Sequence, residues 1–472
     1  MSVDSPREEC GVFAVVAPGR DVARLTYFAL HAMQHRGQES AGMAVSDGRG
    51  MTVVRELGLV ATVFDEPSLA SLVGDQAIGH VRYSTTGANK WDNAQPVARE
   101  RAAGLLALGH NGNLTNTDQL RGELAAQGIE LGASTDSELI AAALAAGVGP
   151  LAESAAATMK RLVGAYSVVA ATENEVVAFR DPNGVRPLVL GRLDAGWCVA
   201  SETCAFGQVG AEFEREIRPG EIVILRHDGV ESIQAVEPRD TKLCVFEQIY
   251  FARPDSILDG GTVWQRRRQM GAQLARESTP NADLVVGLPD SGTPAAIGFA
   301  NQAGIDYTEA VVRNRYVGRS FIQPDQSLRR HGVRLKFSPL KDVITGKRLV
   351  VVDDSIVRGT TIGEVVQMLR DAGATEVHLR ISSPPILWPC FYGIDMASRD
   401  ELIAANHSID QIAEMTGATS LAYLSLDGLH DALGPPNGGY CRACLTGDYP
   451  IAPPDSTNKL RFDVDVCEGI PT

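Results

Sequence analysis

The chain has 472 residues, with 43 lysines and arginines against 58 aspartates and glutamates, which gives a formal net charge of −15. This length predicts two or three domains, and the 44% hydrophobic fraction supplies enough apolar side chains for large cores. The composition excludes collagen-like, low-complexity and wholly disordered chains, and the negative charge argues against nucleic acid or an anionic membrane as a partner.

No apolar run approaches the roughly 20 residues of a membrane-spanning helix, and the N-terminus lacks the basic and apolar regions of a secretory signal. Eight cysteines are too few for a secreted disulfide scaffold of this length. We therefore expect a cytoplasmic protein. Its cysteines are then expected to bind a metal, to catalyse a reaction, or to be buried as small apolar side chains.

The first half of the chain predicts a layered α+β domain. Up to about residue 230, short apolar runs bounded by Gly, Asp and Asn are typical of strands, and helical patterns lie among them. The predicted strands are residues 11–17, 41–46, 77–83, 165–171 and 221–225, and the predicted helices are residues 24–34, 118–127 and 136–146. This pattern favours antiparallel sheets covered by helices.

After a polar connector at residues 227–240, predicted strands alternate with helices. The strands are residues 284–288, 348–352 and 377–381, and a helix is expected to begin near Thr360. Such alternation predicts a parallel, doubly wound sheet that binds ligands at the carboxyl ends of its strands. The last stretch of about 50 residues is rich in Gly and Pro and is predicted to be irregular.

Cys10 begins the first predicted strand, after nine polar and acidic residues that we interpret as a propeptide. Removal of residues 1–9 would leave Cys10 as the N-terminal residue, and its α-amine, with a pKa near about 8, can serve as a base for the thiol. A disordered tail before a buried cysteine is the alternative for an isolated cysteine. Four motifs that follow in order, at residues 35–42, 79–85, 110–113 and 135–138, favour the first interpretation.

Together with Cys10, these motifs resemble the class II glutamine amidotransferase domain, an N-terminal-nucleophile hydrolase of αββα architecture, over residues 10–230. The resemblance implies that Cys10 attacks the side-chain amide of L-glutamine. It also implies that Asn111 and Gly112 form the oxyanion hole, which is usually a large term in acyl transfer. A hairpin turn is the structural alternative for Asn111 and Gly112.

The same resemblance assigns the residues that bind the substrate. Arg82 is implied to hold the α-carboxylate of glutamine and Asp136 its α-ammonium group. The backbone at Arg36 and Gly37 is implied to lie against the substrate. A surface ion pair is the alternative for Arg82 and Asp136.

A second site is expected at the exit of the strand at residues 348–352. Asp353 and Asp354 follow this buried run, and a Gly/Ser/Thr-rich loop then opens a helix. Backbone N–H groups in such a loop can hold an anion, and paired carboxylates can bind sugar hydroxyls or Mg²⁺. A capped strand–turn–helix is the alternative, but two carboxylates at a strand exit are costly to bury without a partner.

This string resembles the phosphoribosylpyrophosphate (PRPP) signature of type I phosphoribosyltransferases, and residues 288–293 resemble the pyrophosphate loop of that family. The implied PRPP contacts are Asp353, Asp354, Ser355, Val357, Arg358, Gly359, Thr360, Thr361, Asp290, Ser291 and Gly292. One Mg²⁺ ion per subunit is implied at Ser291, Asp353 and Asp354.

Residues 313–348 contain ten Lys or Arg and two Asp, a local charge of +8 in an acidic chain. Few aromatic residues lie among these basic residues, so stacking on nucleic-acid bases is not supported. A loop that closes over a diphosphate explains the charge better. The resemblance implies the same, with residues 315–319 as a flexible loop over PRPP.

Cys441 and Cys444 form a Cys-x-x-Cys pair, and Cys244 and Cys390 are available as two further ligands. From the residues alone, zinc and a [4Fe–4S] cluster are equally compatible with this set. Cys198, Cys204 and Cys467 are interpreted as structural or incidental.

With residues 250–256, the combination of both domains resembles the glutamine PRPP amidotransferase (amidophosphoribosyltransferase) family, in its iron–sulfur branch. The resemblance implies a [4Fe–4S] cluster, homo-oligomers (dimer or tetramer), feedback inhibition by purine nucleotides, and the first committed step of purine synthesis. The expected organisation is a propeptide at 1–9, a glutaminase domain at 10–230 and a transferase domain at 231–472. Alternatives are another class II amidotransferase, a nucleotide-sensing regulator and an iron–sulfur redox protein.

Overall fold

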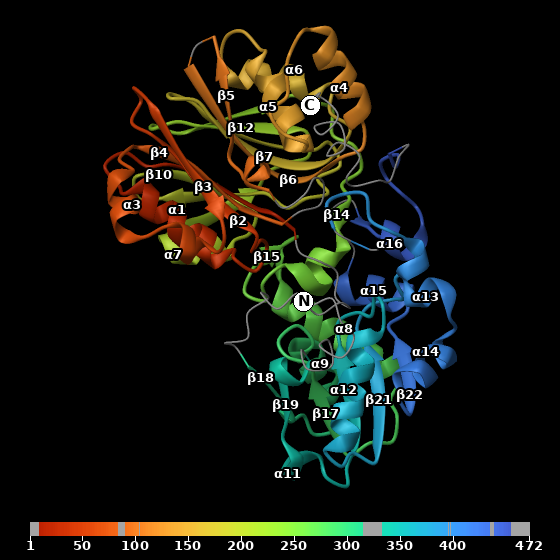
Figure 1. Ribbon diagram of the computed structural model, residues 1–472. Helices are drawn as coiled ribbons and strands as arrows, with labels where there is room; N and C mark the ends of the chain where they lie inside the picture. Colours follow the sequence, from red (N-terminus) through yellow and green to blue (C-terminus); the bar gives the residue numbers. More distant parts are fainter. Residues whose placement is uncertain are drawn as a thin grey trace, which may run out of the picture.

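The computed structural model describes residues 9–83, 90–102, 104–314, 333–394, 396, 398–434 and 439–454. Two bodies lie one above the other in Figure 1, the upper built from the first half of the chain and the lower from the second. Each body has its own sheets and apolar core, as the change of pattern along the sequence predicts. No helix in the described part of the chain is long and apolar enough to cross a membrane.

The first body contains two antiparallel sheets. The seven-stranded sheet has the order β11-β9-β10-β1-β4-β2-β3, and its strands are β1 (Gly11–Val16), β2 (Ser40–Ser46), β3 (Met51–Leu57), β4 (Gln76–Arg82), β9 (Val189–Leu193), β10 (Gly196–Ala200) and β11 (Glu212–Glu216). The six-stranded sheet has the order β13-β12-β8-β7-β6-β5, and its strands are β5 (Val97–Arg101), β6 (Gly104–Leu114), β7 (Gly164–Ala171), β8 (Val176–Arg180), β12 (Glu221–Leu225) and β13 (Val230–Gln234).

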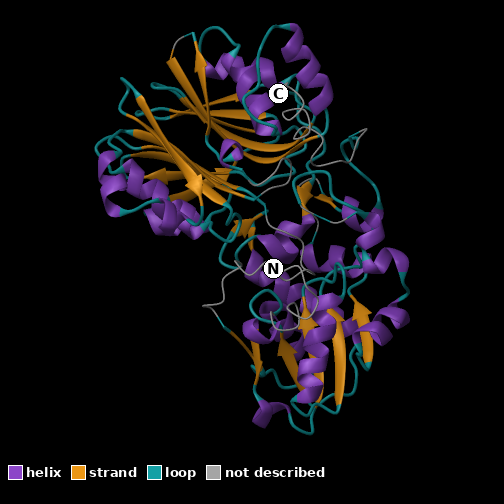
Figure 2. Cartoon of the chain, viewed as in Figure 1, coloured by secondary structure: helices purple, strands orange, loops and turns teal. Residues whose placement is uncertain are grey.

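Helices cover the outer face of each sheet, so the body has four layers (Figure 2). The helices α1 (Val22–Ala32) and α7 (Cys204–Val209) lie on the seven-stranded sheet, and α4 (Thr117–Ala126), α5 (Asp136–Ala145) and α6 (Leu151–Met159) lie on the six-stranded sheet. Alternation along β1 explains the layering, because Phe13 and Val15 pack toward α1 whereas Val12 and Ala14 pack between the sheets. The predicted αββα architecture is confirmed.

The second body is built on a parallel sheet of order β17-β20-β21-β22, with β17 (Leu284–Gly287), β20 (Arg348–Asp353), β21 (Glu376–Ile381) and β22 (Ser420–Tyr423). Its larger helices are α8 (Val263–Glu277), α9 (Thr293–Ala303), α12 (Thr360–Asp371), α14 (Ile409–Thr416) and α15 (Leu426–Leu433). Successive residues of β20 pack in different cores, Val350 in one and Val351 in the other. Burial on both faces explains the uninterrupted apolar run in the sequence, and the predicted parallel sheet is confirmed.

The described chain also contains shorter elements. They are α2 (Val60–Val63), α3 (Glu66–Ser71), α11 (Lys341–Ile344), α13 (Ile403–Asn406), α16 (Ala443–Thr446), β14 (Leu243–Cys244), β15 (Ile257–Leu258), β16 (Gly261–Thr262), β18 (Val311–Arg313), β19 (Phe337–Pro339) and β23 (Tyr440–Cys441). Single turns of 3₁₀-helix lie at Trp91–Asn93 and Arg399–Glu401, and a short π-helix lies at Glu247–Phe251.

Two expectations differ from the structure. The polar connector predicted at residues 227–240 contains β13, which pairs with β12 along its whole length, so the first body extends past residue 230. The predicted irregular tail contains α15, whose Leu429 and Leu433 pack in the core beside α8. Both elements are short and mix apolar with polar residues, so neither stands out from a loop in the sequence.

Candidate active sites

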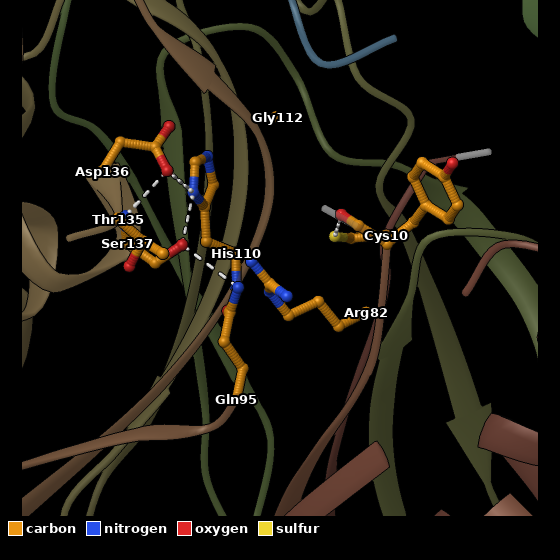
Figure 3. Close-up of a pocket in the computed structure, with 9 residues that line it drawn as sticks. Cys10, Arg82, Gln95, His110, Gly112, Thr135, Asp136 and Ser137 are labelled. Atoms are coloured by element: carbon orange, nitrogen blue, oxygen red, sulfur yellow. Dashed lines mark hydrogen bonds and ion pairs between the residues drawn. The ribbon is translucent and has the colours of Figure 1, made fainter. Parts of the chain in front are cut away.

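A pocket in the first body gathers most of the predicted glutaminase residues. Cys10 directly precedes β1, Arg82 ends the neighbouring β4, Gly112 lies in β6 of the other sheet, and Asp136 begins α5. These four line the pocket together, as Figure 3 shows. The remaining lining residues are Tyr83, Gln95, His110, Thr135 and Ser137. The structure therefore brings four residues that are distant in the sequence to one place.

Cys10 is buried and carries its proton in this form of the chain. Its Sγ donates to the backbone carbonyl of Tyr83 over 3.4 Å. Burial raises the pKa of the Cys10 thiol to about 11, although the bond to Tyr83 and the charge of Arg82 act in the opposite direction. At neutral pH the thiol therefore needs a base before it can act as a nucleophile.

Asn111 and Gly112 lie inside β6, where they pair with Ser167 and Tyr166 of β7. The hairpin-turn alternative is therefore wrong. Asn111 is 1% exposed, and its Nδ2 group has no hydrogen-bond partner among the described residues. Gly112 has φ +145°, and a Cβ atom there would lie 2.0 Å from the carbonyl oxygen of Ala165. A buried amide donor without a partner costs free energy unless a ligand satisfies it.

Arg82 and Asp136 are both buried, so the surface-pair alternative is wrong for them too. Arg82 lies 3.5 Å from the carboxylate of Glu39. The Asp136 carboxylate accepts hydrogen bonds from the backbone N–H of Ser137 (2.9 Å) and from the backbone N–H of Leu114 (3.0 Å). A buried cation and a buried anion thus face the same pocket and can orient a zwitterion such as an amino acid.

Arg36 and Gly37 are not among the pocket-lining residues, and they support the pocket from behind. Arg36 is fully buried, and its Nε donates to the backbone carbonyl of Cys10 over 3.1 Å. A Cβ atom at Gly37 would lie 2.6 Å from the backbone N of Arg82, so only glycine allows this approach.

Sequence reasoning gave no role to five residues that line the pocket, and three of them are linked by hydrogen bonds. Gln95 accepts a hydrogen bond from the backbone N–H of His110 (2.7 Å) and donates to the Ser137 hydroxyl (3.1 Å). His110 Nδ1 lies 3.1 Å from the same hydroxyl. His110 and Ser137 stand inside motifs that the sequence analysis quoted, whereas Gln95 has no motif that marks it.

The second predicted site lies where β17 and β20 end side by side. Leu288 N–H donates to the carbonyl of Val352 over 2.9 Å, which joins the two loops that follow these strands. Asp354 accepts a hydrogen bond of 2.6 Å from the hydroxyl of Ser355, and Ser291 of the other loop lies near enough to lower the pKa of Asp354. The predicted pyrophosphate loop and PRPP loop are thus in direct contact.

The two carboxylates at this site are strongly perturbed. Burial and the neighbouring charge of Asp354 raise the pKa of Asp353 well above its ordinary value. Burial also raises the pKa of Asp354, although hydrogen bonds from Ser291 and Ser355 act against the shift. Two adjacent buried carboxylates are costly to ionise together, which is the situation that a bound cation relieves.

The remaining predicted PRPP contacts surround these carboxylates. Gly292 caps α9, and Gly359, with φ +80°, caps α12, so two helix N-termini lie at the carboxyl end of the sheet. Thr360 and Thr361 are the first residues of α12, and Val357 is buried.

Two charged side chains near these loops have partners in this structure. Arg358 donates to Glu401 over 2.6 Å, and Asp290 forms an ion pair with Arg313. The predicted flexible loop at residues 315–319 lies outside the described residues.

The four predicted ligand cysteines come together in the core of the second body. Cys244 in β14 pairs directly with Cys441 in β23, and Cys444 lies in α16. The carbonyl of Cys444 accepts 3.0 Å hydrogen bonds from Leu387 N–H and Trp388 N–H, which brings the segment of Cys390 alongside. Burial raises the pKa of Cys244, Cys441 and Cys444.

The spacing of these thiols is wide. Among the described residues, one group of candidate metal ligands is tightly clustered. It consists of His35, Glu202 and Cys204, whose ligand atoms all lie within 4.8 Å of one another. No three of the four predicted ligand cysteines approach one another that closely. Glu202 itself already accepts hydrogen bonds from Ser256 and from Arg36, whose positive charge opposes a metal ion there.

The comparisons with known proteins agree with this division into two bodies. A family model described as the glutamine amidotransferase domain matches residues 80–208, and one described as the phosphoribosyl transferase domain matches residues 255–382. The chain is 51% identical over 466 residues to an amidophosphoribosyltransferase of Synechococcus elongatus, with 97% of this chain and 94% of the relative covered.

Two solved structures resemble the whole chain. The glutamine PRPP amidotransferase of Bacillus subtilis, complexed with ADP and GMP, has a TM-score of 0.89 and 45% identity, and the match covers 95% of this chain and 99% of that one. A structure titled as the allosteric regulatory enzyme of purine biosynthesis has a TM-score of 0.90 and 46% identity, with 95% and 98% covered.

Proposed function

We infer the residue-level chemistry of this chain from the family to which it belongs, the amidophosphoribosyltransferases. The enzyme takes ammonia from glutamine and transfers it to PRPP with release of pyrophosphate, which gives 5-phosphoribosylamine for purine biosynthesis. It is both a glutamine amidotransferase and a pentosyltransferase. The other class II amidotransferases, the sensor and the redox protein are thereby excluded as its function.

We propose that Cys10 is the nucleophile of the glutaminase, after removal of residues 1–9. The Cys10 sulfur attacks the side-chain amide carbon of glutamine while its proton moves to the new α-amine. Asn111 Nδ2 and Gly112 N–H donate to the oxyanion, the C–N bond breaks, ammonia leaves, and water hydrolyses the thioester to glutamate. Arg82 and Asp136 hold the α-carboxylate and α-ammonium groups. Asn111 itself is not among the pocket-lining residues, but it stands between His110 and Gly112, which are. Its buried, unpartnered amide is the observation that carries the proposal.

Asn111→Ala is the direct test, because it removes one oxyanion donor and leaves the nucleophile in place. The kcat of glutamine hydrolysis should fall by about 10²–10³-fold with little change in KM, since the lost bond forms with the oxyanion. Synthesis from ammonium salt should continue. Asn116→Ala is the matched control, because the Asn116 side chain bonds the backbone at Arg161 and Val163. If Asn111→Ala and Asn116→Ala hydrolyse glutamine with the same kcat, Asn111 is not part of the oxyanion hole.

We propose that PRPP binds where β17 and β20 end. The loop at residues 355–361 and the N-terminus of α12 hold the 5-phosphate, and the loop at 290–292 holds the pyrophosphate. Hydroxyl and carboxylate oxygens of Ser291, Asp353 and Asp354 are the donors that Mg²⁺ prefers, and the ion would neutralise the leaving pyrophosphate. Ammonia then forms the new C–N bond at the anomeric carbon as the C–O bond to pyrophosphate breaks.

We propose that ammonia crosses between the sites where the oxyanion strand meets the second body. Asn113 Nδ2 donates to the carbonyl of Phe391 over 3.0 Å, and a Cβ atom at Gly393 would lie 3.1 Å from Gly112 Cα. The segment that directly follows Cys390 therefore abuts the glutaminase pocket. A closed route matters because ammonia released into water becomes protonated and is lost as a nucleophile.

We propose that Cys244, Cys390, Cys441 and Cys444 hold a [4Fe–4S] cluster. A tetrahedral zinc ion with bonds of about 2.3 Å would bring the four sulfurs within roughly 4 Å of one another. The four thiols are more widely spaced than that. A cluster binds each cysteine through a different iron, so it needs the wider spacing. A bound cluster suits these buried cysteines. Burial disfavours free thiolates, and the iron would neutralise much of the negative charge of the thiolates that bind it.

Cys441→Ser and Cys444→Ser should remove the iron signal and most of the soluble protein. Cluster binding couples to folding, and these residues restrain the last described segment of the chain. Anaerobic absorbance and iron content per chain provide the measurement. Cys198→Ser is the control, because this thiol is equally buried but lies in β10 of the first body. Variants at 441 and 444 that stay soluble, brown and active would contradict the ligand assignment.

We further propose that the glutaminase domain runs from Cys10 through β13 and that the transferase domain follows it to residue 472. Purine nucleotides are proposed as feedback inhibitors, because the solved relative from Bacillus subtilis is complexed with ADP and GMP. A cytoplasmic homo-oligomer, dimer or tetramer, is proposed from the family.

A further inference from the structure

Glu9, the residue before Cys10, is almost completely buried. Its side chain is 1% exposed, although it ends a stretch of polar residues. One carboxylate oxygen lies 3.0 Å from a guanidinium nitrogen of Arg36, and the other forms an ion pair with Arg186. Glutamate is rarely buried to this extent without a structural reason. The carboxylate therefore occupies a built site between two arginines.

This site contains more carboxylates than guanidinium groups. The buried set is formed by Arg36, Arg186, Glu9, Glu202 and Glu247, each at most 1% exposed. Arg36 contacts all three carboxylates, at 2.6 Å for Glu247, and Arg186 lies 3.8 Å from Glu247. His35 at the edge of the set, 26% exposed, contacts Glu202 and carries a charge only when protonated.

Loss of Glu9 leaves two arginines and two glutamates in this buried set. With Glu9 present, two guanidinium groups face three carboxylates, and without it they face two. A buried charge without a partner is strongly destabilising, so most buried ion pairs cannot lose a member cheaply. Here departure of Glu9 still leaves each arginine beside a carboxylate, because Arg36 keeps Glu202 and Glu247 and Arg186 keeps Glu247. Glu9 is thus a member that the folded protein can release.

Arg36 also fixes the other side of the Glu9–Cys10 peptide bond. Its Nε donates to the carbonyl of Cys10 over 3.1 Å while a second nitrogen contacts the Glu9 carboxylate. One rigid guanidinium therefore holds groups on both residues of the bond. Restraint of a reacting bond beside its nucleophile is a large source of rate in intramolecular reactions.

We propose that Arg36 and Arg186 bind the Glu9 carboxylate to position the Glu9–Cys10 bond for cleavage by the Cys10 thiol. The inference rests on the proposed removal of residues 1–9. The Cys10 sulfur attacks the Glu9 carbonyl carbon, the C–N bond breaks, and the thiol proton passes to the departing α-amine. Water then hydrolyses the thioester, which releases peptide 1–9 as a carboxylic acid and restores the thiol.

Variants of Glu9 test this positioning role, because the mature enzyme lacks the residue. Glu9→Gln and Glu9→Ala should slow the appearance of chains that begin at Cys10 by about tenfold or more, and Glu9→Asp less. Intact mass, followed over time on iron-loaded protein, gives the rate. Iron loading is needed because Cys244 N–H bonds the carbonyl of Val185, so the cysteine set adjoins Arg186. Mature chains from every variant should show wild-type glutaminase activity.

Two controls separate the possible failures. Glu66→Gln removes a carboxylate that is 73% exposed and should leave the cleavage rate unchanged. A chain in which Met1 directly precedes Cys10 should fold and become active after loss of Met1. If that chain fails to fold, Glu9 is a folding residue and the positioning role is wrong.

Cleavage of Glu9→Gln and Glu9→Ala at the wild-type rate would overturn the positioning role alone. Fully active wild-type protein that retains residues 1–9 would overturn both the role and the propeptide itself.

Discussion

Cys10→Ala is expected to abolish glutamine-dependent synthesis of phosphoribosylamine while synthesis from ammonium salt continues near the wild-type rate. The loss should reach about 10⁴-fold or more, because removal of a covalent nucleophile eliminates the acyl-enzyme route. The proposed transferase site uses ammonia and PRPP and does not need Cys10. Its loops lie in the other body of the protein. Pyrophosphate release measures both routes, with the ammonia assay at high pH where free NH₃ is abundant.

Cys198→Ala is the matched control for this substitution. Cys198 is fully buried in β10, where it pairs with Val15 of the strand that follows Cys10. It should lose some stability and keep both activities. A folded Cys10→Ala protein that has lost the ammonia route would show that the two reactions do not occupy separate sites, and the two-site account would then fail.

The fold was largely predictable because the central strands of both bodies are buried on both faces. β1 and the middle of β20 each pack into two cores, so each leaves an apolar run in the sequence. β13 left no such pattern. It is an edge strand with exposed Glu231 and Ser232, and a strand that is exposed on one side resembles a connector.

The site was predictable where one motif carries one function. Cys10, Gly112 and Asp354 each stand in a motif whose spacing already implies chemistry. The structure brings the motifs of Cys10 and Gly112 together at one pocket, and it places the motif of Asp354 beside the loop of Ser291. Contacts between distant side chains are different, because no local spacing encodes them. The pairing of Glu9 with Arg186 and the place of Gln95 in the pocket depend on how the sheets pack, so only the structure reveals them.

Asp353→Asn and Asp354→Asn are expected to weaken synthesis from glutamine and from ammonium salt together, by about 100-fold. Each substitution keeps the shape of the side chain but removes a charge on which the proposed contacts to Mg²⁺ and the ribose hydroxyls depend. The protein should remain at least as stable as the wild type, because burial and mutual repulsion already disfavour the charged pair. Pyrophosphate release by both routes and the thermal midpoint together distinguish lost binding from unfolding.

Asp283→Asn is the matched control, because Asp283 lies at the opposite end of the same strands. Its carboxylate accepts 2.8 Å hydrogen bonds from the backbone and guanidinium of Arg348, the first residue of β20. This variant should lose a little stability and keep both syntheses, while basal hydrolysis of glutamine should persist in all three variants. If Asp353→Asn and Asp354→Asn make phosphoribosylamine from ammonium salt as fast as Asp283→Asn does, PRPP does not depend on these carboxylates. The carboxyl end of β20 would then lose its assignment as the transferase site.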